Sequence, residues 1–264
     1  MRKAIGVFDS GVGGLTVVKE LIHLLPHEDI VYFGDTARVP YGTKSRETVM
    51  RFSIENILFL LKQKVKLICV ACNTSSSVAL PAIRYHFRVP IVVVITPGVR
   101  EAVYATQHRR IGVIGTLATI RSRAYEIQIR QLDPKIKVWA VACPLFVPFV
   151  EEGWTKGKVI GEVAKIYLKP LKKAGVDTVI LGCTHYPLLK PLIKKTLGEK
   201  VSLIDSAKQV AMEVKRILFQ EGLLNETGLG RHNFYVSDNP EGFSQLAKRF
   251  LGKPIRNVKR INYV

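Results

Sequence analysis

The chain of 264 residues is 47% hydrophobic and carries a formal net charge of +19 at pH 7. This hydrophobic content is ample for globular cores, and the length lies where one core commonly divides into two domains. No apolar run is long enough to cross a bilayer, and the residues after Met1 lack the pattern of a signal peptide, so we expect a cytoplasmic protein without membrane contact.

Short apolar runs that are typical of buried strands alternate with segments of helical periodicity. We predict strands at residues 4–8, 30–33, 67–71, 91–95, 110–114, 137–142, 178–181, 201–204 and 234–236. Apolar residues follow helical spacing over 18–25 and again over 210–218, and Ser45 is a candidate N-cap for a helix that continues to Leu61. This alternation predicts an α/β fold in which mainly parallel sheets are flanked by helices.

Three pairs of segments occur in the same order in the two halves of the chain. Residues 5–10 resemble 111–116, the residues around Cys72 resemble those around Cys183, and 94–98 resemble 203–207 more loosely. The members of each pair are roughly 110 residues apart, which indicates two tandem α/β units. We predict a first, discontinuous domain of residues 1–97 plus 208–264 and a second domain of residues 98–207, with a crossing between them at 96–98.

Cys72 and Cys183 are placed alike in these two units. Each ends an apolar run and is followed by small hydrogen-bonding residues. Each thiol should therefore lie at the carboxyl end of a parallel strand, where open α/β sheets bind ligands. Two thiols placed alike on two similar halves suggest a single substrate held between them.

A glycine-rich turn closes the first predicted strand at residues 9–14. Its spacing differs from Gly-x-Gly-x-x-Gly and it lacks a Walker lysine, so an ordinary tight turn remains open as an alternative to an anion-binding loop. Asp9 and Ser10 place a carboxylate and a hydroxyl at the strand end. The positive end of the following helix would face a substrate carboxylate.

The four cysteines are not expected to form disulfides, because cytosolic thiols are normally reduced. Cys69 and Cys72 match Cys-x-x-Cys, but a strand directs their side chains to opposite faces. No suitably spaced histidines follow, so we expect no metal site, and Cys69 and Cys143 are interpreted as core residues. His185, two residues after Cys183, would favour a thiolate or shuttle a proton, although most loop histidines are structural.

The high positive charge is compatible with a nucleic-acid partner or with anionic ligands. The basic residues, however, are scattered through helix-like segments, and no basic strip interleaved with aromatic residues occurs. We interpret the charge as a solvated basic surface and do not expect a nucleic-acid partner.

Taken together, several segments closely resemble the glutamate racemases, the cofactor-independent members of the aspartate/glutamate racemase superfamily. They are residues 6–15, 35–42, 71–74, 181–187 and 234–238, and the resemblance covers essentially the whole chain. It implies two α/β domains related by a pseudo-twofold axis, with the active site between them. It also implies a cytoplasmic isomerase, often a homodimer, that needs no cofactor and interconverts L-glutamate and D-glutamate, the latter for peptidoglycan.

The resemblance further implies roles for individual residues. Cys72 and Cys183 would be the two proton donor/acceptors, assisted by Asp9 and His185 respectively. The residues that would hold the substrate are Asp9, Ser10, Tyr41, Gly42, Asn73, Thr74, Thr184 and His185. Secondary site residues would be Thr116, Thr119 and Glu151.

The resemblance leaves alternatives open. The substrate could instead be aspartate or a hydantoin, as in other members of the superfamily. A thiol redox protein that uses Cys69 and Cys72 and a basic nucleic-acid-binding module are the alternatives from other classes. Two thiols suit racemisation best, because a thiol pKa of about 8.5 lies near neutrality and one group can serve each face of the α-carbon.

Overall fold

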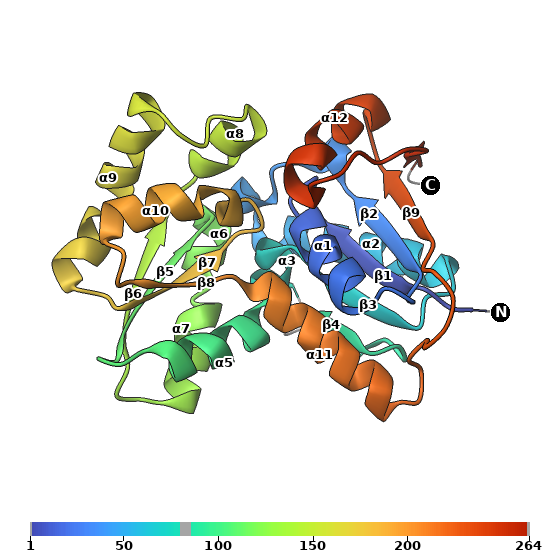
Figure 1. Cartoon of the computed structure of the whole chain (residues 1–264), viewed down its shortest axis with the longest axis horizontal. Coiled ribbons are helices and arrows are strands. Elements are labelled where there is room, and N and C mark those ends of the chain that lie inside the picture. The colour runs from blue at the N-terminus through green and yellow to red at the C-terminus, as the bar shows by residue number, and fades with distance from the viewer. Residues whose placement is uncertain (1, 80–85, 263–264) are drawn as a thin grey trace.

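Two parallel sheets organise the molecule, in a computed structural model that describes residues 2–79 and 86–262 (Figure 1). Within these residues the first sheet has six strands, and every pairing in it is parallel. Their order is β10 (Lys259–Arg260), β9 (His232–Val236), β2 (Ile30–Gly34), β1 (Ile5–Asp9), β3 (Leu67–Val70) and β4 (Ile91–Val93). The three strands β2, β1 and β3 are buried along their whole length, which explains their nearly uninterrupted apolar sequence.

The second sheet repeats the central order of the first. Its four parallel strands are β6 (Lys137–Ala142), β5 (Arg110–Gly115), β7 (Thr178–Gly182) and β8 (Ser202–Ile204), in that order. Each strand of the series β2-β1-β3-β4 therefore has a counterpart at the same place in β6-β5-β7-β8. The segments that resemble each other in sequence occupy equivalent positions, so the internal repeat is confirmed.

Helices cover both sheets. Those that pack on the first sheet are α1 (Leu15–Leu24), α2 (Arg46–Lys62), α3 (Asn73–Val78), α11 (Ser206–Gln220) and α12 (Pro240–Leu251). Those around the second are α5 (Ile95–Ala105), α6 (Leu117–Arg121), α7 (Ala124–Leu132), α8 (Phe146–Glu151), α9 (Lys158–Ala174) and α10 (Lys190–Leu197). Short 3-10 turns are η1 (Thr36–Arg38), η2 (Tyr41–Thr43) and η4 (Tyr186–Leu189). We call these two groups of elements the first lobe and the second lobe.

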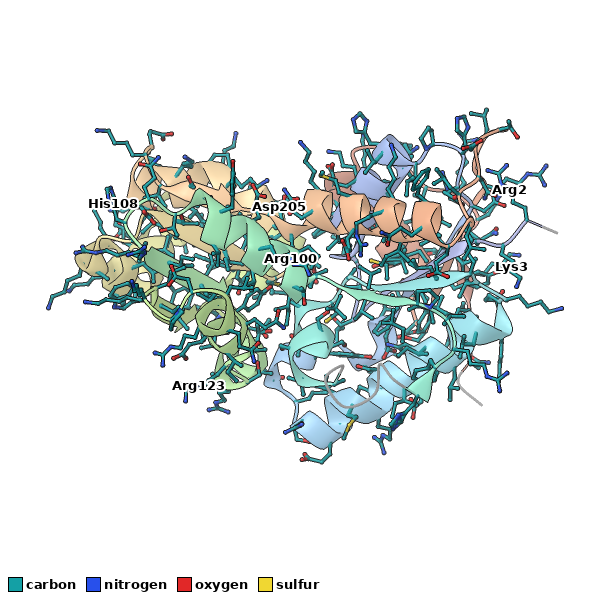
Figure 2. All side chains as sticks on the ribbon, turned by 90° about the horizontal axis from the view of Figure 1, so that it is seen from below. Arg2, Lys3, Arg100, His108, Arg123 and Asp205 are labelled. Atoms are coloured by element: carbon teal, nitrogen blue, oxygen red, sulfur yellow. The ribbon has the colours of Figure 1, made fainter. Side chains whose placement is uncertain are left out.

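The helices α5 and α11 join the lobes. They pack against each other, while α11 lies on α1 and α5 lies on α7. In the view from below, α11 begins next to Asp205 and runs along the first lobe, with Arg100 of α5 near its start (Figure 2). Asp205 caps α11 by accepting a hydrogen bond from the backbone N–H of Ala207 at 3.0 Å. Both crossings of the chain between the lobes therefore lie next to each other.

The predicted α/β class and the strand positions are confirmed, with two corrections. The strand expected over 91–95 ends at Val93, because α5 already begins at Ile95, so residues 96–98 lie in the first turn of a helix, where Pro97 is tolerated. The strand β10 was not expected, since its two residues are basic and exposed. Ser45 caps α2 as expected, its Oγ accepting from Thr48 N at 3.3 Å. The exact domain bounds, 1–97 plus 208–264 and 98–207, stay a prediction.

Buried apolar side chains of both lobes belong to one continuous cluster, which extends from Ile5 and Val18 to Leu168 and Ile180. The lobes therefore share a packed boundary. None of the helices in the described ranges has both the length and the apolar composition that a bilayer crossing requires.

Candidate active site

A cavity of about 360 Å³ lies between the two lobes, at the carboxyl ends of their strands. From the first lobe it is lined by Ser10, Tyr41, Gly42, Cys72, Asn73 and Thr74, among others. From the second lobe it is lined by Thr116, Val147, Glu151, Cys183, Thr184 and His185, among others. Larger hollows of about 840 and 610 Å³ elsewhere on the described surface contain neither Cys72 nor Cys183. The cavity thus gathers every predicted site residue except Asp9 and Thr119, which lie just behind its wall.

Cys72 reaches the cavity from the end of β3. It precedes α3 as its N-cap, and its sulfur accepts a hydrogen bond from Ser75 N at 3.5 Å while the thiol faces Ser10 Oγ at 3.8 Å. Burial, together with the nearby charge of Asp9, raises the pKa of Cys72 to about 11. The side chain is therefore a neutral thiol at pH 7, ready to donate a proton.

Cys183 occupies the matching position after β7, with a different set of neighbours. Its Sγ lies 3.8 Å from Nδ1 of His185, whose Nε2 lies 2.9 Å from Oε1 of Glu151. Burial lowers the pKa of His185, but contacts with Cys183 and Glu151 outweigh it and raise that pKa to about 10. An imidazolium therefore lies beside Cys183, where it stabilises negative charge that develops on the sulfur.

Asp9 ends β1 and is almost completely buried. Its Oδ2 accepts from Gly11 N at 3.0 Å, whereas Oδ1 has no hydrogen-bond partner among the described residues. Burial raises the pKa of Asp9, against the opposing charge of His185 and several backbone N–H groups. A buried carboxylate oxygen without a partner is costly, and groups of this kind are concentrated at functional sites.

Three threonine hydroxyls form a cluster across the boundary between the lobes. Thr74 Oγ1 of the first lobe lies 3.0 Å from Thr116 Oγ1 of the second, which lies 3.0 Å from Thr119 Oγ1. Thr116 also caps α6 by accepting from Thr119 N at 3.3 Å. Hydroxyls are neutral donors that can rotate toward a carboxylate.

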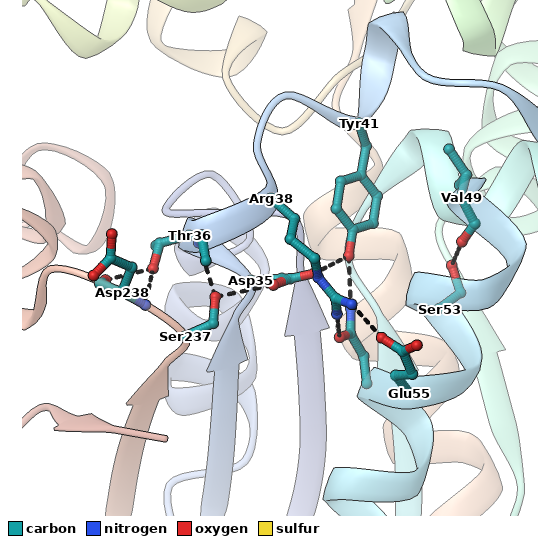
Figure 3. Close-up of polar contacts among 11 residues, drawn as sticks. Asp35, Thr36, Arg38, Tyr41, Val49, Ser53, Glu55, Ser237 and Asp238 are labelled. Atoms are coloured by element: carbon teal, nitrogen blue, oxygen red, sulfur yellow. Dashed lines mark hydrogen bonds and ion pairs between the residues drawn. The ribbon is translucent and has the colours of Figure 1, made fainter. Parts of the chain in front are cut away.

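The loop that carries Tyr41 is fixed by the buried carboxylate of Asp35 (Figure 3). Asp35 accepts hydrogen bonds from Tyr41 OH, from Arg38 Nε at 2.7 Å and from Ser237 Oγ at 2.9 Å. Asn56 Nδ2 donates to the same tyrosine oxygen at 3.1 Å. Burial and the charge of Asp35 raise the pKa of Tyr41 far above its usual value, so the phenol stays neutral. Tyr41 thus lines the cavity while its hydroxyl is bonded to Asp35 and Asn56.

Glycines permit close contact of the lobes at the cavity. A Cβ atom on Gly42 would lie 2.6 Å from Thr116 Cβ, and one on Gly13 would lie 2.7 Å from the ring of His185. A side chain at either position would force the neighbouring residues apart. The glycine-rich turn of residues 9–14 therefore allows the second lobe to approach, a purpose that its spacing did not reveal.

Three residues that contact the site were missed by the sequence analysis. Tyr125 OH donates to Asn73 Oδ1 at 2.6 Å, Phe250 packs edge-on against the ring of His185, and Arg249 donates to the backbone oxygen of Glu151. All three lie on amphipathic helices, where an aromatic or basic residue has an ordinary structural explanation. No signal in the local sequence distinguishes them.

The four cysteines, all within the described residues, are free thiols. Cys69 is fully buried in the core of the first lobe, and burial raises its pKa to about 12. Among the described residues, no three His, Cys, Asp or Glu side chains are grouped so that they could hold a metal ion.

Comparison with known proteins gives a consistent result. The family model described as Asp/Glu/Hydantoin racemase matches residues 5–214. The chain is 53% identical over 261 residues to the glutamate racemase of Geobacter metallireducens, an alignment that covers 98% of this chain and 97% of that relative.

Solved structures agree with this likeness. One is a crystal structure of glutamate racemase from Francisella tularensis in complex with D-glutamate, with a TM-score of 0.93 and 42% identity over 99% of this chain and 98% of that chain. Another is the Thermus thermophilus glutamate racemase in complex with beta-chloro-D-alanine, with a TM-score of 0.90 and 48% identity over 99% and 97% of the two chains.

Proposed function

The chain belongs to the Asp/Glu/Hydantoin racemase family, and from this premise we propose that it is a glutamate racemase that interconverts L-glutamate and D-glutamate. One observation supports this above all. Two thiols line the same cavity, one from each lobe, and they follow equivalent strands of the two sheets. The identity of 53% to a curated glutamate racemase supports glutamate as the substrate.

In the proposed mechanism one sulfur removes the α-proton and the other returns a proton to the opposite face. The electron pair of the Cα–H bond passes into the substrate carboxylate, and the proton forms an S–H bond. The second thiol then gives its proton to Cα and becomes the thiolate. After one turnover the charges on Cys72 and Cys183 have exchanged, and the reverse reaction begins from that state.

The surroundings of the two sulfurs suit this exchange. At pH 7 Cys72 is a thiol, and Cys183 lies beside His185, whose pKa is raised to about 10. The negative charge of Asp9 disfavours a thiolate at Cys72, and protonation of Asp9 removes that penalty. We therefore propose that Asp9 assists Cys72, while His185 and Glu151 assist Cys183.

The weak acidity of the Cα–H bond is the chief obstacle to removal of the α-proton. His185 is the one cationic side chain in the described lining of the cavity, which contains no lysine or arginine, so most of the donors to the substrate carboxylates must be neutral. Candidates are the side chains of Ser10, Asn73, Thr74, Thr116 and Thr184. Donors fixed by folding cost no reorganisation when charge develops, and they act strongly where water is excluded.

The decisive experiment uses purified protein without added metal or cofactor. The circular dichroism signal of D-glutamate and of L-glutamate should decay to zero, and in D₂O deuterium should enter at Cα from either enantiomer. Aspartate and a hydantoin are assayed in parallel. Activity on one of these in place of glutamate, or a requirement for pyridoxal phosphate, would contradict the proposal.

We also propose that the D-glutamate supplies peptidoglycan synthesis in the cytoplasm and that the enzyme is a homodimer without a nucleic-acid partner. These points rest on resemblance to the glutamate racemases. Rescue of a D-glutamate auxotroph by the wild-type gene, but not by Cys72→Ser, tests the biosynthetic role. Light scattering during size-exclusion chromatography tests the dimer. Salt-sensitive retention on a DNA column would contradict the proposal that the enzyme has no nucleic-acid partner.

A further inference from the structure

A buried hydrogen bond crosses the boundary between the lobes directly beside Cys72. Tyr125, on α7 of the second lobe, donates its hydroxyl to Oδ1 of Asn73, the first residue of α3 in the first lobe, at 2.6 Å. Both side chains are buried, and burial raises the pKa of Tyr125, so its hydroxyl remains a proton donor. Asn73 follows Cys72 in the chain and lines the cavity.

This hydrogen bond determines which edge of the Asn73 amide faces Tyr125. A primary amide presents one acceptor oxygen and one NH₂ donor group on opposite edges. Oδ1 is bound to Tyr125, so the NH₂ group on the other edge of the amide is the part of this cavity-lining side chain that is left to donate to a ligand. In the flipped orientation the carbonyl oxygen would face the cavity and repel a bound carboxylate.

We propose that Tyr125 is a positioning residue that holds the amide of Asn73 with its NH₂ group toward the substrate. The inference rests on the proposed function, since it assigns a donor to a carboxylate ligand. Tyr125 does not line the cavity, so it acts through Asn73.

The same bond links the orientation of a site residue to the contact between the lobes. Its donor lies on α7, which packs on α5, and its acceptor lies on α3, which contacts α7. If the lobes separate, Asn73 loses the tyrosine and its amide is free to rotate. The site is therefore fully organised only when the lobes are in the contact seen here.

The first test is a double-mutant cycle. Tyr125→Phe removes only the hydroxyl and should lower kcat/KM for glutamate roughly tenfold, the usual worth of one such hydrogen bond. In the Asn73→Ala background the same substitution should have almost no further effect. Equal losses in both backgrounds would overturn the proposal. So would unchanged kinetics combined with a lower Tm, because the bond would then be structural only.

The second test does not depend on activity. In ¹⁵N-labelled protein the side-chain NH₂ signals of Asn73 are identified by their loss in Asn73→Asp. In Tyr125→Phe these signals should shift and broaden, and they should be unchanged in the control Tyr104→Phe, whose ring is exposed. Unaltered Asn73 signals in Tyr125→Phe would sink the proposal. Inactivity of wild-type protein on glutamate would instead refute the proposed function and leave this measurement valid.

Discussion

Gly13 and Thr184 touch across the boundary between the lobes, so that a Cβ atom on Gly13 would lie 2.2 Å from Thr184 Oγ1. A side chain at Gly13 would force the side chains of Thr184 and His185, or the lobe that carries them, to shift. Gly13 lies in the turn that follows Asp9 at the end of β1, and Thr184 directly follows Cys183 after β7. The close contact of Thr184 and His185 with the first lobe, beside Cys183, therefore depends on the absence of one methyl group.

Gly13→Ala should reduce kcat/KM for glutamate by roughly 100-fold, because misplacement of reacting groups by about 1 Å has effects of this size. Far-ultraviolet circular dichroism should be unchanged, since the core strands are not touched. The matched control is Gly161→Ala, which meets nothing within 4 Å on α9 and should be slightly stabilising. Full activity of Gly13→Ala would show that the contact is dispensable.

The two thiols should be separately essential. Cys72→Ser and Cys183→Ser should each lower kcat by about 10²–10⁴-fold, the range expected for loss of a general acid or base. Cys69→Ala should retain most activity, because that residue packs in the core. Rates are measured by circular dichroism with both enantiomers. A strong loss in Cys69→Ala with little loss in Cys183→Ser would favour the dithiol alternative.

Stability should fall as pH rises from about 6.5 to about 10. The pKa of His185 is raised to about 10 in the folded protein, against about 6.5 when unfolded. Over this window the folded state binds a proton that the unfolded state has lost, so the stabilisation present below pH 6.5 disappears by pH 10.

Urea unfolding across this range measures the effect. In Glu151→Gln the carboxylate that helps to raise the pKa of His185 is absent. The fall in stability with rising pH should therefore be complete at a lower pH than in the wild-type protein. Identical pH dependence in the two proteins would mean that Glu151 does not act on this histidine.

Asp35→Asn should weaken both the fold and substrate binding. The substitution removes the negative charge that pairs with Arg38 and one oxygen that can accept from Tyr41 OH. The free energy of unfolding should fall by about 1–3 kcal/mol, the cost of weakening the hydrogen bonds of buried polar groups. Because Tyr41 and Gly42 line the cavity, KM for glutamate should rise more than kcat falls.

The control for this network is Glu55→Gln. Glu55 also pairs with Arg38 but is partly exposed, so its substitution should lower the free energy of unfolding by less than about 1 kcal/mol. Urea midpoints and steady-state kinetics check both variants. Equal destabilisation by the two substitutions would mean that the buried carboxylate of Asp35 contributes no more to stability than the exposed partner of Arg38.

Much of the architecture followed from local patterns. Apolar runs with no interruption predicted the central strands, and the repeat placed Cys72 and Cys183 at equivalent strand ends, as found. These features depend on neighbours in the chain, which is why periodicity reveals them. The strand β10 escaped prediction because Lys259 and Arg260 are polar and pair only at the sheet edge.

Other features of the site arise only when distant segments meet. The bond of Tyr125 to Asn73, the Asp35 network that reaches Ser237, and the contact of Phe250 with His185 each join residues far apart in the chain. Taken alone, each of these residues has an ordinary place on a helix or in a loop. Residue types along the chain thus established the strands, the repeat and the two thiols. Packing of one lobe on the other decided which side chains orient and protonate the site, because hydrogen-bond direction and burial are properties of neighbours in space.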